Sequence, residues 1–279
     1  MPEGDTIARA AATLHAALAG QPVTHAESVL ADVSTAFAAR RVVGRTVERV
    51  TSHGKHLALT FSGDLVLRTH MRMHGAWHLY RPDERWRRAA HRLRIRLDTP
   101  PWVALAFDVY DAEVVAGQPE RVPAIARLGP DLLAPLVDVA AVAARIRGEG
   151  ARPLADVLLD QGVASGIGNV FRSEVLFLEG LHPRTPADAL TVAQADALVR
   201  RTVRLLRLNA RPGAGRRITT GRLAPSENLW VYQRTGRPCR RCGTPIRSWA
   251  DMPVARRVYW CDRCQPVTAG PEPAADATE

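Results

Sequence analysis

The residues best suited to covalent chemistry stand at the amino terminus, where Pro2 and Glu3 follow the initiator methionine. Methionine aminopeptidases remove Met1 when the next residue is small, and the chain would then begin with a secondary amine beside a carboxylate. Such a pair can serve as a nucleophile with an adjacent acid and base. The α-amino pKa is about 7.7 to 8, so roughly a tenth of the amine is neutral at pH 7. The MPE sequence is common, so this interpretation depends on motifs elsewhere in the chain.

Four cysteines near the other end have the spacing of a metal site. They form a C-x2-C-x18-C-x2-C pattern made by Cys239, Cys242, Cys261 and Cys264. Two such knuckles close a tetrahedral Zn²⁺ site, and four protein ligands leave no position open for water, so the ion would be structural. Two disulfides are the alternative, which the lack of an export signal disfavours. We therefore expect one structural zinc ion, with Arg256 on the hairpin between the knuckles.

The charge of the chain favours a polyanionic partner. The formal net charge is +10, which points to nucleic acid rather than to a neutral small molecule. An arginine-rich composition without function is the alternative. No apolar run is long enough to cross a membrane, and no signal peptide is recognised, so we expect a soluble cytoplasmic protein without membrane contact.

Lys55 is the only lysine among the 38 Lys and Arg residues. An arginine cannot be deprotonated in a protein, whereas a lysine amine can exchange a proton or form a Schiff base. Lys55 therefore has either a chemical role or no role beyond chance survival.

Five histidines cluster around Lys55 and after it. Metal binding on a helix is one interpretation, but Gly75 and the β-like pattern argue against it. We predict exposed polar positions on a strand and a turn, where they could contact DNA. The five are His53, His56, His70, His74 and His78.

A glycine-rich turn precedes a predicted helix in GVASGIGNVFRSE, residues 162–174. Backbone N–H groups and the positive helix end can meet a phosphate there. Asn169, at the N-cap or first helical position, could face the same anion. A plain helix connection is the alternative, because a lone G-x-G is a weak signal.

Residues 2–122 are predicted to form the first domain. Within 5–19, Ile7, Ala11, Leu14 and Leu18 recur at helical spacing. From residue 42 onward the pattern changes to short β-like runs separated by glycines. These patterns predict a mostly β domain with a helix at its start.

The remaining chain is predicted to contain two further units. Thr191 and Gln194 form a capping-box pair at the start of the longest helix. Residues 209–228 carry several arginines with Gly and Pro and are interpreted as a mobile basic loop. The units are an α-helical domain at 123–230 with helices at 139–147, 154–161, 169–178 and 191–208, a compact cysteine-containing unit at 231–266, and a disordered tail at 267–279.

Six separated motifs resemble the formamidopyrimidine-DNA glycosylase and endonuclease VIII family, and the resemblance runs from Pro2 to Gln265. The motifs are MPEGDTI, GKHLAL around Lys55, RLGPD at 127–131, LLDQGVASGIGNVFRSE at 158–174, VYQRTGRPCRRCG and YWCDRCQ. The resemblance implies an α+β multidomain fold: an N-terminal β-sandwich, a helix-two-turn-helix domain and a zinc ribbon, with damaged DNA across the cleft. It also implies a bifunctional DNA glycosylase and abasic-site lyase.

The resemblance assigns roles to individual residues. In the family the N-terminal proline attacks C1′ of the damaged nucleotide, displaces the base and forms an iminium, and β- and then δ-elimination cut the strand. By matching position, Pro2 is this nucleophile and Glu3 the acid and base that helps to open the sugar. Lys55 matches the lysine that contacts the lesion phosphate and transfers protons, and Arg256 matches the arginine assigned to phosphate binding and δ-elimination. Phosphate contacts are implied for Arg127 and Asn169.

One loop of the family fills the gap that a flipped-out base leaves, because unstacking the duplex costs free energy. This loop aligns with Arg72, Met73 and His74. Met73 matches the wedge, and the two polar residues could address the orphaned partner base.

The N-terminus departs from the family pattern, since Asp5 and Thr6 stand where better-known members carry Pro-Glu. The opening and the YWC before the second knuckle look more like endonuclease VIII, which implies oxidised pyrimidines. Oxidised purines (8-oxoguanine or a formamidopyrimidine) are the alternative substrates, and a catalytically silent zinc-ribbon protein that binds damaged DNA is the third interpretation. No organic cofactor is implied, and we expect a monomer.

Overall fold

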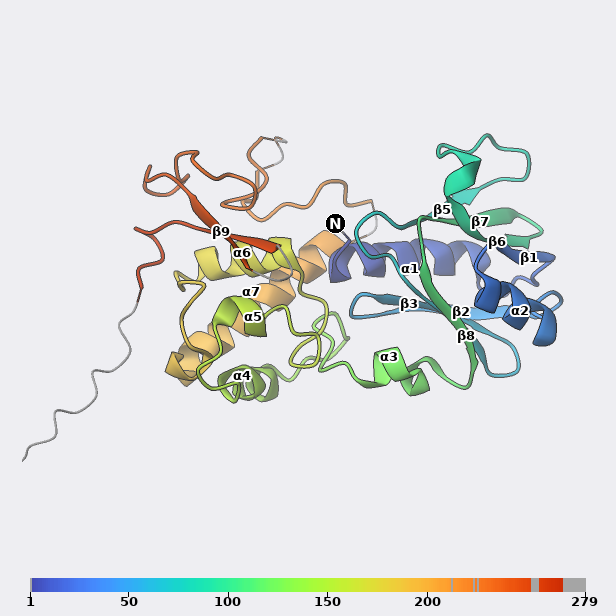
Figure 1. Ribbon diagram of the computed structural model, residues 1–279, viewed down its shortest axis with the longest axis horizontal. Coiled ribbons are helices and arrows are strands. Elements are labelled where there is room, and N and C mark those ends of the chain that lie inside the picture. Colours follow the sequence, from blue (N-terminus) through green and yellow to red (C-terminus); the bar gives the residue numbers. More distant parts are fainter. Residues whose placement is uncertain (1, 212, 223, 225, 252–255, 268–279) are drawn as a thin grey trace, which may run out of the picture.

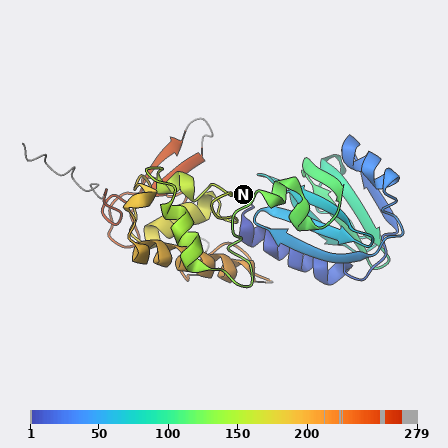
Figure 2. The same cartoon turned by 90° about the horizontal axis from the view of Figure 1, so that it is seen from below.

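The computed structural model describes residues 2–211, 213–222, 224, 226–251 and 256–267. Two bodies lie side by side, a β-rich one and a helical one, and the linker that carries α3 joins them (Figures 1 and 2). The start of α1 lies at the junction between the two bodies (Figure 1). Among the described residues, no helix has the length and apolar character needed to cross a membrane.

The first body confirms the predicted β-sandwich with a leading helix. Its helices are α1 (Gly4–Leu18), α2 (Ala31–Ala39) and the 3-10 turn η1 (Ala90–Arg92). One antiparallel sheet has the order β1-β6-β7-β5 and the other β2-β3-β4-β8. The strands are β1 (His25–Ser28), β2 (Val47–His53), β3 (His56–Phe61), β4 (Leu65–His70), β5 (Ala76–Tyr80), β6 (Leu93–Thr99), β7 (Trp102–Phe107) and β8 (Asp111–Ala116).

The apolar face of α1 closes the core of this body. Ile7, Ala11, Leu14 and Leu18 are all buried, as their spacing predicts, and they belong to one cluster with inward-facing residues of both sheets. Burying side chains of the size of Ile7, Leu14 and Leu18 contributes about 1.5–3 kcal/mol each. The helix that begins two residues after Pro2 is therefore fixed to the sheets along its whole length.

The helical unit contains the predicted long helices. A capping box joins Thr191 and Gln194, which confirms the sequence signal. The helix expected at 154–161 ends at Val157, because Asp160 turns back to accept a hydrogen bond from the backbone N–H of Gly162 at 2.9 Å. The elements are η2 (Pro119–Arg121), α3 (Pro123–Ala126), α4 (Val139–Arg147), α5 (Leu154–Val157), α6 (Asn169–Leu178), η3 (Ala187–Ala189) and α7 (Val192–Ala210).

The cysteine-containing unit is a small ribbon packed on α6. Strands β9 (Arg247–Asp251) and β10 (Arg256–Trp260) form an antiparallel pair. Phe177 of α6 lies in the same buried cluster as Val231 and Ile246 of the ribbon. The ribbon is thereby positioned directly beside the helix whose first turn meets the amino terminus.

Candidate active site and DNA interface

Glu3 lies in the interior of the protein rather than at an exposed chain end. Its residue is 0% exposed. Its carboxylate accepts hydrogen bonds from three backbone N–H groups at the start of α6: Val170 at 2.7 Å, Gly168 at 3.0 Å and Phe171 at 3.3 Å. A helix N-terminus leaves such groups unpaired and carries a partial positive charge, so it stabilises a carboxylate. Glu3 therefore ties the amino terminus of the β body to the helical unit.

The glycine-rich turn before α6 is shaped by this contact. A Cβ on Gly168 would lie 2.3 Å from Cγ and Cδ of Glu3, and a Cβ on Gly4 would lie 2.9 Å from the backbone of Gly166. The N–H of Gly4 also donates to the carbonyl of Gly166 at 2.9 Å. Glycine permits this close approach of two backbones. The anion that these backbone N–H groups bind is therefore the Glu3 carboxylate, whereas a phosphate contact of the Asn169 side chain stays a prediction.

Asp5 forms a buried ion pair with Arg217. The Nε and Nη2 atoms of Arg217 donate to the two carboxylate oxygens of Asp5 at 2.9 and 2.6 Å. Asp5 is 0% exposed, and the Arg217 side chain is 13% exposed. Burial alone would lower the pKa of Arg217, but Glu3 and Asp5 outweigh it and raise the pKa above its usual value. The guanidinium therefore stays charged, 3.9 Å from Oε1 of Glu3.

The segment at 209–228 was expected to be mobile, yet its described residues are hydrogen-bonded to one another and, through Thr219, to α6. The Asn209 side chain pairs with both backbone groups of Ile218, at 2.7 and 2.9 Å. The Asn228 amide donates to the carbonyl of Arg217 at 2.7 Å, and the Thr219 hydroxyl donates to Glu174. These contacts correct the expectation and fix Arg217 in place.

Pro2 borders a pocket of about 460 Å³. Met73 and His74, two of the three predicted gap-filling residues, line the same pocket. Thr6 and Arg217 complete the wall near the amino terminus. The structure thus brings the predicted nucleophile and the predicted wedge to one hollow, although they are some 70 residues apart.

The loop Met71–Gly75 connects β4 of one sheet to β5 of the other and is held from within the β-sandwich. Arg72, which has a positive φ of 49°, donates to one carboxylate oxygen of Asp111 through Nε at 2.9 Å and Nη2 at 2.5 Å. Met73 is 51% exposed, and His74 is exposed. An exposed apolar side chain held on a fixed loop is suited to insertion between bases.

Lys55 lies half-buried in the two-residue turn between β2 and β3. Its neighbour Gly54 donates its backbone N–H to Asp131 of the helical side at 2.8 Å, and a Cβ on Gly54 would lie 2.8 Å from that of Ser165. Asp131 also accepts from the N–H of Leu133 at 2.8 Å. The position of Lys55 therefore depends on a second contact across the two bodies. Lys55 is not among the residues that line the Pro2 pocket.

The histidines around Lys55 differ from the prediction of exposed positions. Only His74 is exposed, and the other four are half-buried. The rings of His56 and His70 lie 4.9 Å apart between centroids. Burial is the main cause that lowers the pKa of His56 to about 3 and that of His70 to about 4. Both rings are therefore neutral at pH 7.

The three remaining predicted DNA contacts have different surroundings. Arg127 is exposed at the end of α3 and donates to the carbonyl of Pro123 at 3.0 Å. Asn169 is 5% exposed, and its amide donates to the carbonyl of Arg257 in the ribbon at 3.0 Å, so it joins α6 to β10. Arg256 begins β10 opposite Asp251, but its side chain lies outside the described residues.

The four cysteines meet as their spacing predicts. Their Sγ atoms all lie within 4.8 Å of one another, with 3.9 Å between Cys239 and Cys264 and 3.5 Å between Cys242 and Cys261. Tetrahedral zinc with Zn–S bonds of about 2.3 Å requires sulfurs separated by roughly 3.8 Å. The four thiols are thus placed to bind a metal ion.

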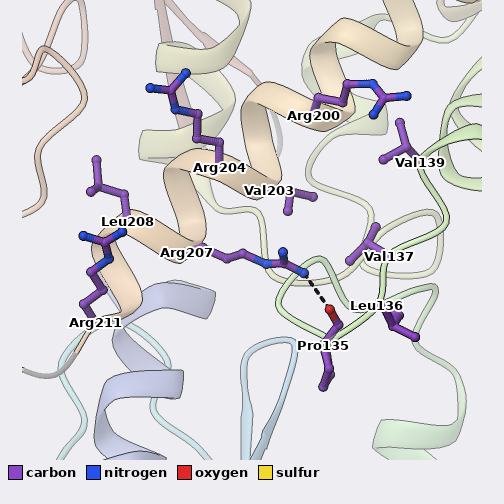
Figure 3. A pocket seen from close by; sticks show the side chains of 10 residues that line it. All are labelled: Pro135, Leu136, Val137, Val139, Arg200, Val203, Arg204, Arg207, Leu208 and Arg211. Atoms are coloured by element: carbon purple, nitrogen blue, oxygen red, sulfur yellow. Dashed lines mark hydrogen bonds between the residues drawn. The ribbon is translucent and has the colours of Figure 1, made fainter.

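A larger hollow of about 650 Å³ runs along α7 (Figure 3) and shares no lining residue with the Pro2 pocket. Arginines along α7 line it, and Arg207 donates to the carbonyls of Ala134 and Pro135 at 2.8 and 3.1 Å. The hollow lacks every predicted catalytic residue.

Comparison with known proteins places this geometry in a family. The family model of the formamidopyrimidine-DNA glycosylase N-terminal domain matches residues 1–109, and that of its H2TH domain matches residues 128–219. A probable endonuclease 8 2 of Streptomyces coelicolor is 38% identical over 98% of this chain and 96% of that protein.

Two further relatives and one solved structure agree. The DNA-(apurinic or apyrimidinic site) lyase Nei2 of Mycolicibacterium smegmatis is 37% identical over 95% of this chain and 99% of its own. Endonuclease 8 of Escherichia coli is 32% identical over 95% of this chain and 100% of its own. Lactococcus lactis Fpg, solved with DNA that contains an abasic site, superposes with a TM-score of 0.80 at 22% identity, over 95% of this chain and 100% of that one. The chain belongs to the formamidopyrimidine-DNA glycosylase and endonuclease VIII family.

Proposed function

We propose that this protein is a base-excision-repair enzyme that removes oxidised pyrimidines from DNA and cuts the strand at the resulting abasic site. One observation carries the proposal: Pro2 borders a pocket, and the adjacent Glu3 is held by three N–H groups of α6. Relatives named endonuclease 8 over nearly the full chain support the activity and the pyrimidine preference.

The first step uses the nitrogen of Pro2 after Met1 is removed. Its lone pair forms a bond to C1′ of the damaged nucleotide, and the glycosidic bond breaks with its electron pair leaving on the base. Glu3 takes up the N–H proton of the attached Pro2 nitrogen and passes it to the ring oxygen as the C1′–O4′ bond opens, which leaves an iminium between Pro2 and C1′. Loss of a C2′ proton then expels the 3′ phosphate, which is the β-elimination, and a second elimination releases the 5′ phosphate.

Other predicted residues would bind the DNA. Lys55 and Arg256 would contact phosphates near the reacting sugar, and Arg127 and Asn169 phosphates farther along the strand. Met73 would occupy the space of the flipped nucleotide beside Arg72 and His74. The arginine-rich composition and the net charge of +10 suit such backbone contacts.

The proposal includes one structural zinc ion on the four cysteines. It would fix the knuckles of the ribbon and contribute on the order of 10 kcal/mol to its folding. Metal analysis of the purified protein should give one zinc per chain, and a preparation that folds and binds DNA without metal would contradict this part.

Borohydride trapping tests the reaction. Protein whose loss of Met1 has been verified by mass spectrometry is incubated with duplex DNA containing thymine glycol or 8-oxoguanine, and the iminium is reduced to a stable cross-link. We expect a cross-link, formed faster with thymine glycol. The reverse order would favour oxidised purines, and no cross-link with either lesion or with an abasic site would favour a non-catalytic DNA-binding protein.

The Glu3→Gln variant should separate base excision from cleavage of an abasic site. An amide cannot supply the proton that opens the sugar ring, so base excision should fall by about 100-fold or more. Cleavage of a preformed abasic site, whose sugar is already open in part of the population, should fall less. Equal losses on both substrates would contradict the proposed role of Glu3.

A further inference from the structure

Arg217 is held at the wall of the Pro2 pocket by three side chains. Its Nε and Nη2 atoms are engaged by Asp5, and Nη2 also lies 3.3 Å from the hydroxyl of Thr6. The guanidinium lies 4.9 Å above the ring of Phe171. Among the described residues, its Nη1 atom makes no hydrogen bond, and Glu3 lies 3.9 Å from it. A fixed cation thus keeps two N–H donors available beside the predicted nucleophile.

The segment around Arg217 is anchored to α1 at a second point. Arg9 donates through Nη1 to the carbonyls of Ala214 and Gly215. Arg9 and Asp5 stand one turn apart on α1, so the segment 214–217 follows the first turns of that helix. This wall of the pocket is therefore built from residues that the chemistry of Pro2 and Glu3 does not use.

The other arginines of the pocket are engaged in a different way. Arg88 and Arg92 both pair with Asp108, at 2.9 and 2.6 Å, and Arg88 also donates to the carbonyl of His74 at 3.1 Å. Arg88 thereby holds the loop that carries Met73, and Arg92 holds Asp108, the partner that it shares with Arg88. Of the four arginines that line the pocket, Arg217 is the one that contacts the N-terminal residues Asp5 and Thr6 through its side chain.

We infer that Arg217 determines which oxidised base the pocket accepts, by donating hydrogen bonds from Nη1 to the carbonyl oxygen at position 4 of that base, with Asp5 as its positioning residue. The inference rests on the proposed function and narrows its substrate class. A guanidinium has donors and no acceptor. Its N–H groups can therefore donate to the 4-carbonyl oxygen of a uracil or thymine derivative. The 4-amino group of a cytosine derivative is also a donor, so both groups would be left without a hydrogen-bond partner in the pocket.

Two matched lesions test this directly. 5-Hydroxyuracil and 5-hydroxycytosine differ at position 4, where one carries a carbonyl and the other an amino group. Single-turnover excision from otherwise identical duplexes should favour 5-hydroxyuracil by about 10-fold in the wild-type protein. In Arg217→Gln, whose amide both donates and accepts, the ratio should fall to within about 2-fold of one, even where the absolute rates fall with the loss of the Asp5 pair.

A double variant guards against a folding artefact. Arg217→Gln alone leaves Asp5 as a buried charge without its partner, which can destabilise the protein. Asp5→Asn with Arg217→Gln removes both charges and should show the same loss of discrimination with a melting temperature nearer to wild type. Arg96→Gln is the matched control, because Arg96 pairs with Asp98 through two nitrogens on β6, outside the pocket. It should keep the wild-type ratio.

The outcomes separate this inference from the proposed function. If the wild-type protein forms no borohydride cross-link with any lesion or abasic DNA, the proposed function fails. If the wild-type protein does form a cross-link but Arg217→Gln, alone or with Asp5→Asn, keeps the wild-type preference for 5-hydroxyuracil, Arg217 does not select the base and the inference is overturned.

Discussion

Two parts of the site receive their stabilising contacts from different regions of the molecule. The amino-terminal residues Pro2 to Thr6 are held from the other body: Glu3 bonds to residues 165 to 168 positions later, and Asp5 to a residue 212 positions later. The loop Met71–Gly75 is held from within the β-sandwich, through Asp111, which is 39 positions from Arg72, and Arg88, which is 14 positions from His74. One part is assembled by docking of the two bodies, and the other by local folding of the β-sandwich.

The two parts also differ in burial, and therefore in how much their ion pairs contribute to stability. Glu3 and Asp5 are fully buried, so removing a partner leaves a charge without compensation, which costs about 3–5 kcal/mol. The Arg72 side chain is 68% exposed in its pair with Asp111, and pairs of that kind contribute about 0–1 kcal/mol. Chemistry at Pro2 should therefore respond sharply to changes at the junction, while the loop should tolerate the loss of its ion pair.

Gly168→Ala should have the largest effect, since it acts on the junction itself. The new Cβ would lie 2.3 Å from Glu3, so the carboxylate or the turn must shift. Overpacking of this kind costs about 1–3 kcal/mol, and a displacement of about 1 Å at a reacting group lowers the rate by roughly 100-fold. Single-turnover excision of thymine glycol and thermal unfolding measure the two effects.

Gly148→Ala is the control for that variant. Gly148 ends α4, has no positive φ, and its Cβ would approach only carbonyl oxygens of its own helix, at 3.3 and 3.4 Å. Wild-type excision is expected. If Gly168→Ala also excised at the wild-type rate, the contact between Glu3 and α6 would be irrelevant to the reaction.

Asp131→Ala breaks the second junction contact and should have the next largest effect. The backbone N–H groups of Gly54 and Leu133 lose their acceptor, at about 1–3 kcal/mol for each group left unsatisfied. Lys55 then loses its fixed position, so the yield of borohydride cross-link per unit time should fall by about 10-fold. Asp138→Ala, which removes the N-cap of α4 without touching the β body, should lower stability by about 1 kcal/mol and leave the cross-link rate unchanged. A cross-link rate that falls equally in both variants would refute the role of the junction.

Locally determined features could be predicted from the sequence. The buried face of α1, the capping box of α7 and the meeting of the four cysteines all follow from spacing within a short segment. The resemblance to known motifs supplied the remaining architecture. These features need no knowledge of how the two bodies dock.

Contacts across the junction between the two bodies could not be predicted from the spacing of residues within one segment. The turn at 166–168 has the composition of a phosphate-binding turn, but its glycines make room for Glu3, a residue 165 positions earlier. Arg217 looked like one of several basic residues in a loop, because nothing local to it indicates Asp5 as its partner. Asp5, where the family pattern carries a proline, was the one available signal that a cation should be sought nearby.

Asp111→Ala tests the locally held part and should have a smaller effect. Arg72 is released, so affinity for a duplex with an uncleavable abasic-site analogue should weaken by about 3-fold, which is under 1 kcal/mol. The rate of abasic-site cleavage at saturating DNA should not change. Glu113→Ala is the matched control, because it removes a partner of Arg68 while the pair of Arg72 and Asp111 remains. A loss of cleavage rate as large as that of Gly168→Ala would abolish the distinction between the two parts.

Acid should destabilise the same local part, through His70. Its ring accepts a hydrogen bond at Nδ1 from the backbone N–H of Arg72 at 3.1 Å, which requires that nitrogen to be unprotonated. Burial, the largest cause, lowers the pKa of His70 from 6.5 to about 4, so between these values the unfolded chain binds a proton that the folded chain does not. Stability from this group is therefore fully present above pH 6.5 and falls as the pH drops towards about 4. His70→Asn should show a smaller fall in melting temperature between pH 7 and pH 5 than the wild type, and equal falls would show that His70 does not link acid to the loop.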